Sequence, residues 1–332
     1  MTRVLSGIQP TGDIHLGNYL GALRQWAVDQ HEHDSFYCAV DLHAVTVQQN
    51  PEDLRSKTLE TMATLVAVGL DPEVCTLFVQ SHVPYHTELS WLLECTVSFG
   101  ELRRMTQFKD KSTKQGDAGQ EHVSAGLFTY PALMAADILI YDADRVPVGD
   151  DQRQHLELTR DIAERFNSRY GETLVLPSAA IPKIAARVMD LQEPTNKMSK
   201  STESAAGAVG IFEDTKSIAK KFKRAVTDSD NDVRFDFGTK PGVSNLLSIL
   251  GAATDRDPEI LADQYSQYGP LKSDAADAVI SVLEPVQKRR SELLADPAEL
   301  DRIIARGADK ASEVAAETVQ RAKNAMGFLP LN

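Results

Sequence analysis

Cysteine is scarce: the 332 residues include three, Cys38, Cys75 and Cys95, and no two of them form a Cys-x-x-Cys pair. An odd number of widely spaced cysteines argues against a disulfide framework and against a zinc ribbon. His82 and His86 lie four residues apart near Cys75, but the sequence offers no convincing fourth ligand for a metal. We therefore interpret both as surface or internally hydrogen-bonded histidines and assign no metal ligand.

Long apolar runs are also missing. No stretch reaches the roughly 18 apolar residues that a membrane helix needs, and the longest candidate, Leu127 to Tyr141, is interrupted by Pro131 and Asp137. The first residues hold no apolar core of signal-peptide length. With 42% hydrophobic and 25% charged residues, the composition is that of a packed globular protein. We expect a cytosolic protein without a membrane segment.

Positive charge is in the minority: 35 Lys and Arg face 48 Asp and Glu, a formal net charge of −13. A uniformly acidic surface repels nucleic acid, so any such contact needs basic residues gathered locally. Two clusters meet this condition, one on a predicted helix (Lys216, Lys220, Lys221, Lys223 and Arg224) and one earlier (Arg103, Arg104, Lys109 and Lys111). A solvated face is the commoner meaning of each cluster, and a nucleic-acid contact is the alternative.

Strand and helix patterns alternate over the first part of the chain. Extended, β-rich runs occur at residues 3–6, 36–40, 76–79 and 146–148. Helical spacing lies between and after them, at residues 16–27, 51–68, 87–99, 131–141 and 151–167. This alternation predicts an α/β fold with a parallel sheet covered on both faces. After residue 186 helical patterns dominate, over 215–226, 243–250, 273–283 and 298–326. We predict two domains, 1–186 and 187–332.

The first candidate site is the turn from Gly7 to Asn18, which joins the first strand to the first helix. In a parallel sheet such a turn lies where ligands bind. Its glycines let the backbone approach a ligand, and the helix start offers free N–H groups to a phosphate. Thr11, His15 and Asn18 add side-chain donors. On this turn alone, a phosphate site and a plain turn capped by His15 stay equally open.

The second candidate is the segment Asn196 to Ser201, which follows the predicted boundary. Lys197 and Lys200, with two serines, suit a flexible clamp on a polyphosphate. A solvated Lys/Ser linker is the commoner case by composition.

Together the two segments resemble the signatures of the class I aminoacyl-tRNA synthetases. Residues 15–18, His-Leu-Gly-Asn, are similar to the HIGH motif, and residues 197–201 match KMSKS letter for letter. Asn18 departs from the second histidine of the motif, but asparagine also donates to a phosphate. The first motif follows the first strand and the second follows the sheet, as in that class.

Within the class, the chain is identified as a member of the tyrosyl/tryptophanyl subgroup by its compact size and its very early first motif. Further stretches resemble the bacterial tryptophanyl-tRNA synthetases: residues 6–10, 17–23, 100–102, 105–109, 130–131, 133–139, 147–149, 151–152 and 225–229. The polar stretch Lys111–Glu121 is longer than the resemblance leads us to expect.

The resemblance implies a Rossmann-like doubly wound catalytic domain over 1–186 and a smaller all-helical domain over 187–332 that carries KMSKS and binds the tRNA anticodon. It implies activation of L-tryptophan with ATP to tryptophanyl-adenylate and pyrophosphate, then transfer to the 3′ end of tRNA(Trp). The implied enzyme is a cytoplasmic homodimer that uses Mg²⁺ with ATP and no prosthetic group.

The resemblance also implies site residues. For ATP they are Gln9, Pro10, Thr11, Gly17, Asn18, Gly149, Asp150, Asp151, Val188, Lys197, Met198, Ser199, Lys200 and Ser201. The implied catalytic residues, which stabilise phosphate charge, are Thr11, His15, Asn18, Lys197 and Lys200. For tryptophan they are Leu5, Gln9, His43, Tyr130, Met134, Asp137, Ile138, Val146, Val148 and Gln152.

Asp137 also points to tryptophan on physical grounds. It lies in an otherwise apolar helical stretch, residues 132–140, where a carboxylate needs a partner. The indole N–H is a donor only, so one buried acceptor suits it. Met134 and Tyr141 share the helix face of Asp137. The stretch alone favours the alternative, in which Asp137 pairs with an arginine or a backbone group in the core.

Three alternatives are open to test. A tyrosine-specific enzyme of the same subgroup needs polar partners for a phenol, and Asp137 among Met134, Val146 and Val148 argues against it. A silent paralogue that binds RNA or a partner would have lost a KMSKS lysine or Gly17, and both are intact. A nicotinamide-dependent dehydrogenase would show Gly-x-Gly-x-x-Gly after the first strand, which this chain lacks.

Overall fold

The computed structural model describes residues 1–106, 124–147, 152–180, 188–199 and 206–330. Within these residues a parallel sheet has the strand order β3-β2-β1-β4-β5. The strands are β1 (Arg3–Ile8), β2 (Asp34–Ala39), β3 (Thr76–Val79), β4 (Arg145–Pro147) and β5 (Ser178–Ala180). The reversal of strand order about β1 is that of a doubly wound fold, so the predicted α/β class is confirmed.

The first helices follow the predicted pattern, with differences in extent. They are α1 (Leu16–Asn18), a π-helical turn η1 (Tyr19–Leu23), α2 (Arg24–Asp29), α3 (Asp41–Ala44), α4 (Pro51–Ala67), the 3₁₀ turn η2 (Gln80–His82), α5 (Tyr85–Glu94), α6 (Phe99–Arg104), α8 (Ala125–Leu139) and α9 (Arg153–Tyr170). The continuous helix predicted over 87–99 is wrong. Ser98 and Glu101 form a reciprocal capping box that starts α6 as a separate helix.

The two faces of the sheet carry different cores, because successive side chains of a strand point to opposite faces. On one face, Tyr37 and Leu77 belong to a cluster with α4 and with the later helices. On the other face, Phe36 and Phe78 pack with α5, α8 and α9. Both faces are therefore buried, as a parallel sheet requires.

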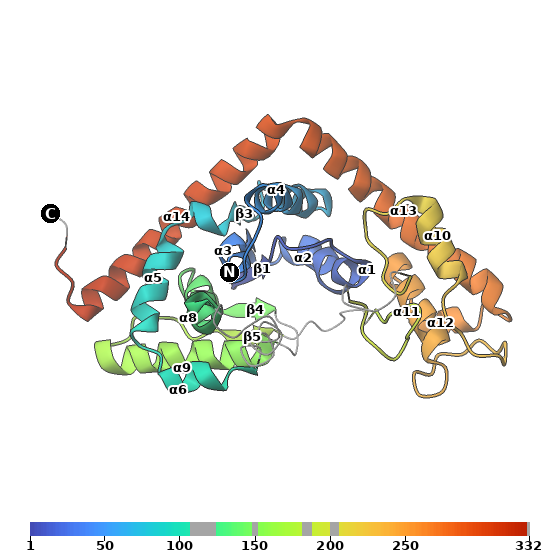
Figure 1. The fold of residues 1–332 in the computed structure, drawn as a ribbon, viewed down its shortest axis with the longest axis horizontal. Coiled ribbons are helices and arrows are strands. Elements are labelled where there is room, and N and C mark those ends of the chain that lie inside the picture. Colours follow the sequence, from blue (N-terminus) through green and yellow to red (C-terminus); the bar gives the residue numbers. More distant parts are fainter. Residues whose placement is uncertain (107–123, 148–151, 181–187, 200–205, 331–332) are drawn as a thin grey trace.

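The later helices form the second part of the chain. They are α10 (Thr215–Lys223), α11 (Pro241–Thr254), α12 (Pro258–Ala262), α13 (Tyr268–Ala295) and α14 (Pro297–Met326). α13 leads from this group to a sharp corner, and α14 returns over the sheet (Figure 1). No helix among the described residues combines the length and the apolar character that a membrane crossing would need.

Helix α14 covers the β3 edge of the sheet. A Cβ atom on Gly307 would lie 1.7 Å from the carbonyl oxygen of Leu77, so glycine permits the helix to touch the strand backbone. Further along, Lys323 of α14 forms an ion pair of 2.8 Å with Glu88 of α5. The last helix of the sequence thus packs on the α/β part and protects its edge strand.

Candidate active site

A cavity of about 380 Å³ opens at the carboxyl ends of β1, β2 and β4, the edge of a parallel sheet where ligands bind. It is lined by Leu5, Ser6, Gly7, Gln9, Cys38, Val40, His43, His86, Tyr130, Met134, Asp137, Ile138, Val146, Pro147 and Gln152. Every residue predicted to contact the amino acid is among these, except Val148, which lies outside the described residues.

Asp137 is the polar centre of the cavity, and side chains from three other elements hold its carboxylate. His43 Nε2 of α3 lies 2.7 Å from Oδ2. Gln80 Nε2 of η2 donates to Oδ1 at 2.7 Å, and His86 Nδ1 of α5 lies 2.7 Å from the same oxygen. The other ring nitrogen of His86 lies 2.7 Å from the hydroxyl of Tyr141. The arginine or backbone partner considered for Asp137 is therefore replaced by two histidines and an amide.

This arrangement keeps Asp137 ionised although it is buried. Burial raises the pKa of the carboxyl, but the adjacent His43 and His86 outweigh burial and hold that pKa at about 2. An ionised carboxylate is an acceptor only. Only His43 reaches Oδ2 among the described residues, so this oxygen keeps acceptor capacity for a donor in the cavity.

Tyr130 and Gln152 stand at another part of the cavity wall. The hydroxyl of Tyr130 lies 2.9 Å from Nε2 of His155, which is 1% exposed. Gln152 occupies the N-cap position of α9, and His155 follows one turn later on the same helix. Burial raises the pKa of Tyr130 to about 12, so its hydroxyl is neutral at physiological pH. The hydroxyl and the amide provide neutral oxygen acceptors beside the cavity.

The HIGH-like segment begins α1 and follows Gly7 and Gln9 of the cavity wall along the chain. His15 is the N-cap residue, and Oδ1 of Asn18 accepts from its main-chain amide at 3.2 Å. Main-chain hydrogen bonds of 2.8 and 3.1 Å join residues 14–16 to residues 209–211, which follow the KMSKS segment. The backbone of the first signature is therefore paired with chain from the second part of the molecule.

The KMSKS segment meets the first signature directly. A Cβ atom on Gly17 would lie 3.6 Å from Cβ of Met198, a van der Waals contact. Lys197 faces Met189 across a short antiparallel ladder, which the amide of Met198 extends by donating to the carbonyl of Val188 at 3.1 Å. Met198 is buried and Lys197 is exposed. The segment therefore holds its methionine inside and presents its first lysine to solvent.

The remaining predicted residues are partly described. Gln9, Thr11 and Asn18 are exposed at the signature turn, while Pro10 and Val188 are buried. The residues predicted for ATP that lie outside the described part are Gly149, Asp150, Asp151, Lys200 and Ser201. The polar stretch Lys111–Glu121 lies outside it as well.

The basic cluster on α10 is mostly exposed. Lys216, Lys220, Lys223 and Arg224 face solvent, whereas Lys221 pairs with Glu213 at 2.6 Å. In the other cluster, Arg103 and Arg104 are exposed, and Lys109 and Lys111 lie outside the described residues.

Sequence reasoning gave no site role to several residues that line the cavity or support Asp137. Gln80, His86 and Tyr141 complete the Asp137 network, and Cys38 lines the wall. His86 was visible in the sequence, and its interpretation as an internally hydrogen-bonded histidine is confirmed. A polar residue in a buried position, such as Gln80 directly after the apolar run Leu77 to Val79, is the one signal that points to such a network.

The sheet order, with one signature after β1 and the other beside it, is that of the class I aminoacyl-tRNA synthetases. The family model described as "tRNA synthetases class I (W and Y)" matches residues 1–284. The chain belongs to this family.

Named relatives match the chain over its whole length. It is 54% identical over 331 residues to Tryptophan--tRNA ligase 2 of Streptomyces avermitilis, covering 99% of this chain and 97% of that one. It is 56% identical over 330 residues to Tryptophan--tRNA ligase of Leifsonia xyli, covering 98% and 97%.

Solved structures agree with these relatives. Tryptophanyl-tRNA synthetase from Mycoplasma pneumoniae superposes with a TM-score of 0.91 at 37% identity, covering 99% of this chain and 98% of that one. The Campylobacter jejuni enzyme complexed with ADP and tryptophan gives 0.83 at 34% identity, covering 98% and 100%.

Proposed function

We propose that this chain is a tryptophan–tRNA ligase. It activates L-tryptophan with ATP to tryptophanyl-adenylate and pyrophosphate, and then transfers tryptophan to the 3′ end of tRNA(Trp). The observation that carries the proposal is the ionised Asp137 beside the apolar walls of a cavity in a chain that carries both nucleotide signatures. The names of its full-length relatives, each a tryptophan–tRNA ligase, support the same substrate.

The cavity suits an indole better than a phenol. Leu5, Met134, Ile138 and Val146 provide apolar walls, and Met packs adaptably against aromatic rings. The indole N–H donates to Asp137 and has no lone pair left to satisfy. A phenol donates equally well, but its oxygen then needs a donor that these walls do not provide, and a buried unpaired polar group is costly. This is the basis on which we favour tryptophan over tyrosine.

The polar end of the amino acid is assigned to the other side of the cavity. Tyr130 and Gln152 hold the ammonium group with neutral oxygens, and Gln9 lies near the carboxylate and ATP. His43 faces the cavity and acts on tryptophan through Asp137, to which it is bonded. These assignments place the carboxylate of tryptophan toward the signature turn.

Activation needs positioning and charge stabilisation rather than a base, because the tryptophan carboxylate is already a nucleophile. It attacks the α-phosphate of ATP, and pyrophosphate leaves. Lys197 and Lys200 neutralise the charge that grows on pyrophosphate, and Thr11, His15 and Asn18 donate to phosphates. Mg²⁺ would come bound to ATP and would offset part of the phosphate charge.

The surroundings of these phosphates are assigned to both signatures. Gln9, Pro10, Gly17, Met198 and Ser199 contact ATP, and the main chain of Val188 contacts adenine. Gly149, Asp150, Asp151 and Ser201 complete the nucleotide site.

For tRNA, we assign residues 1–186 to catalysis and 187–332 to the KMSKS segment and anticodon binding, with α14 packed back on the sheet. The exposed basic face of α10 supports a tRNA contact, because local positive charge offsets the acidic surface. We also propose a homodimer, which sedimentation at micromolar concentration tests.

The experiment is ATP–pyrophosphate exchange with tryptophan and with tyrosine, for the wild type and for Asp137→Asn. We expect exchange with tryptophan only, weakened by the substitution. The control is Asp142→Asn, which removes a carboxylate paired with Arg321 outside the cavity and leaves exchange unchanged. Exchange with tyrosine instead would overturn the pocket assignment, and no exchange with either by folded wild-type protein with Mg²⁺ would overturn the function.

A further inference from the structure

The first lysine of KMSKS has its backbone set by a neighbouring segment. Lys197 is the facing partner of Met189 in the antiparallel ladder, between two main-chain hydrogen bonds of 2.9 and 3.1 Å. The N–H and C=O groups of such a facing pair point outward, away from each other. The main chain of Met189 therefore needs a partner on its outer side.

Asn245 of α11 is that partner. Its Oδ1 accepts from the amide of Met189 at 2.8 Å, and its Nδ2 donates to the carbonyl of Met189 at 2.9 Å. Asn245 is 1% exposed. One side-chain amide thus pairs with both main-chain groups, as a third strand would, and no other neutral side chain of this length offers a donor and an acceptor together.

The helix that carries Asn245 lies close against the same part of the chain. A Cβ atom on Gly242 would be 2.1 Å from the carbonyl oxygen of Val226, so the first turn of α11 touches this backbone directly. The amide of Val226 in turn donates to the carbonyl of Leu191 at 2.8 Å. Leu191 follows Met189 by two residues, so α11 supports the ladder at two points.

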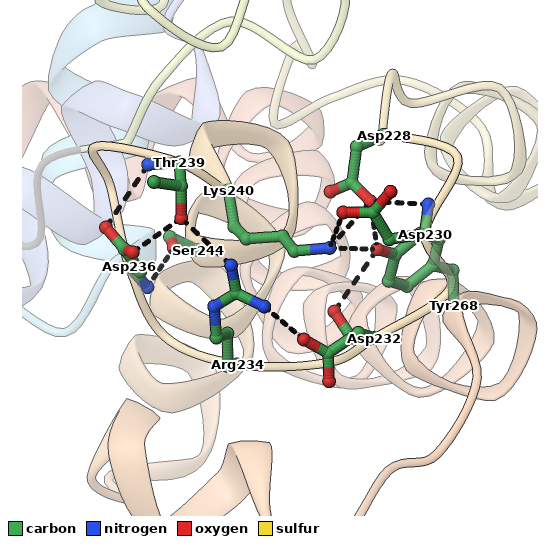
Figure 2. Close-up of polar contacts among 9 residues, drawn as sticks. All are labelled: Asp228, Asp230, Asp232, Arg234, Asp236, Thr239, Lys240, Ser244 and Tyr268. Atoms are coloured by element: carbon green, nitrogen blue, oxygen red, sulfur yellow. Dashed lines mark hydrogen bonds and ion pairs between the residues drawn. The ribbon is translucent and has the colours of Figure 1, made fainter.

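The start of α11 is itself fixed by a buried lysine (Figure 2). Lys240 is 1% exposed, and its Nζ donates to Asp228 at 2.8 Å, to Asp230 at 3.1 Å and to the hydroxyl of Tyr268 at 3.0 Å. The hydroxyl of Tyr268 also donates to Asp228. The ammonium group therefore has its three donors satisfied, and it ties α13 and the preceding loop to the first turn of α11.

The other end of that loop is tied to the residue next to Asn245. The amide of Asp236 donates to Oγ of Ser244 at 2.8 Å, and the carboxylate of Asp236 accepts from the amide and the hydroxyl of Thr239 (Figure 2). The loop and the helix start thus form one hydrogen-bonded unit, which leaves the Asn245 side chain little freedom to move away from Met189.

We propose that Asn245 is a positioning residue for the activation step, which sets Lys197 through its double hydrogen bond to Met189. The inference rests on the proposed function, because Lys197 acts on the pyrophosphate group there. Asn245 touches no reacting atom. It acts on the rate because small displacements of a charged group from the developing charge are costly in rate.

The test compares ATP–pyrophosphate exchange for the wild type, Asn245→Asp and Asn245→Ala. Aspartate keeps the acceptor but loses the donor, so its carboxylate opposes the Met189 carbonyl, and alanine loses both. We expect kcat/KM for ATP to fall about tenfold or more, whereas KM for tryptophan stays within about twofold, because the amino-acid cavity does not include this segment. Rates are normalised to active sites titrated by adenylate formation.

The matched control is Ser248→Ala on the same helix, which removes a hydrogen bond of 2.8 Å within α11 itself and leaves both parameters unchanged. If Asn245→Asp does not fold, Asn245→Ser, which makes at most one of the two bonds, carries the comparison. A merely structural role would lower the active fraction and leave kcat/KM for ATP per active site unchanged, and that result overturns the inference. Absence of exchange in the wild type would instead reject the proposed function.

Discussion

The two halves of the candidate site are held together in different ways. In the amino-acid half, side chains bond to side chains: Asp137, His43, Gln80 and His86 come from four elements and are all buried. In the nucleotide half, main chain bonds to main chain around the two signatures, and Lys197 stands exposed at its edge.

This difference implies that the two halves contribute differently to the stability of the fold and to catalysis. A buried network of hydrogen-bonded polar groups is rigid and is coupled to the stability of the fold. Lys197 is exposed on a backbone that neighbouring hydrogen bonds hold in place. Its side chain is therefore not coupled to the stability of the fold, and its charge acts on the nucleotide alone. We therefore expect substitutions in the buried network of the first half to change stability and amino-acid affinity together, and substitution of the exposed lysine in the second half to change the rate without changing stability.

The largest expected effect is a loss of rate on substitution of Lys197 in the nucleotide half. Lys197→Ala should lower kcat for exchange by roughly 10²- to 10³-fold, because one preorganised charge at the transition state is removed. The free energy of unfolding should change by less than about 0.5 kcal/mol, since the side chain is exposed. Exchange kinetics and urea unfolding measure the two quantities. Lys288→Ala, an exposed lysine on α13, is the control and should change neither.

The second prediction tests the amino-acid half. His86→Leu removes a partner from both Asp137 and Tyr141, which are buried. The expected loss is roughly 2–4 kcal/mol in the free energy of unfolding, because two buried polar groups lose a hydrogen bond, with a raised KM for tryptophan. Urea unfolding and exchange kinetics measure it. The exposed His82→Leu should be nearly silent; equal effects at both positions would break the comparison.

The third prediction concerns the stability of the protein at acidic pH. Burial raises the pKa of Asp137, yet His43 and His86 hold it at about 2, below the usual value of 3.8. Folding lowers the pKa of this carboxyl, so the carboxyl stabilises the folded protein at every pH above its pKa in the unfolded chain. This stabilisation is lost as the pH falls through the pKa that the carboxyl has in the folded protein. The contribution is about 2 kcal/mol, present above roughly pH 4 and lost toward about pH 2.

Urea unfolding of the wild type and of Asp137→Asn at several pH values measures this contribution. The difference in the free energy of unfolding between the wild type and Asp137→Asn should decrease by that amount as the pH falls. Lys197→Ala should show no such narrowing relative to the wild type. A gap for Asp137→Asn that stays constant with pH would mean that the histidines do not hold the carboxylate ionised.

Sequence reasoning reached the two halves unequally. The signatures, strands β1 to β4 and the apolar walls were predictable, because glycine turns, β-rich runs and helical spacing are local patterns. Strand β5 (Ser178–Ala180) was not predicted, because its sequence Ser-Ala-Ala contains no β-rich residue. The predicted amino-acid residues that the structure describes come together in one cavity, although their roles stay predictions. The partners of Asp137 were not predictable, because Gln80 and His86 lie 57 and 51 residues away in sequence and their approach depends on the packing of α5 against α8.

The division of the helices shows the same limit. The break between α5 and α6 depends on a capping box that is visible in the sequence as Ser98 and Glu101, yet the apolar spacing across it suggested one helix. The return of α14 onto the sheet has only a weak local signal, Gly307. Likewise, no local sequence pattern around Asn245 predicts its two hydrogen bonds to the main chain of Met189.

The smallest expected effect is that of Gly17→Ala, a substitution at the contact between the two signatures. In Gly17→Ala the new methyl group would lie 3.0 and 3.1 Å from two atoms of the His15 ring, so the ring must shift by a few tenths of an ångström. We expect kcat/KM for ATP to fall about tenfold. Stability should hold within about 0.5 kcal/mol, because the helix preference of alanine offsets the crowding. Exchange kinetics and urea unfolding measure both.

The control for this change is Gly269→Ala on α13, where a Cβ atom would meet nothing within 4 Å. There alanine should stabilise the protein by about 0.5–1 kcal/mol through the unfolded chain and leave the rate untouched. If Gly17→Ala instead lowers stability and tryptophan affinity as His86→Leu does, the signature turn is coupled to the buried network. The two halves would then act as one unit, because a shift of His15 would have been transmitted into the amino-acid cavity.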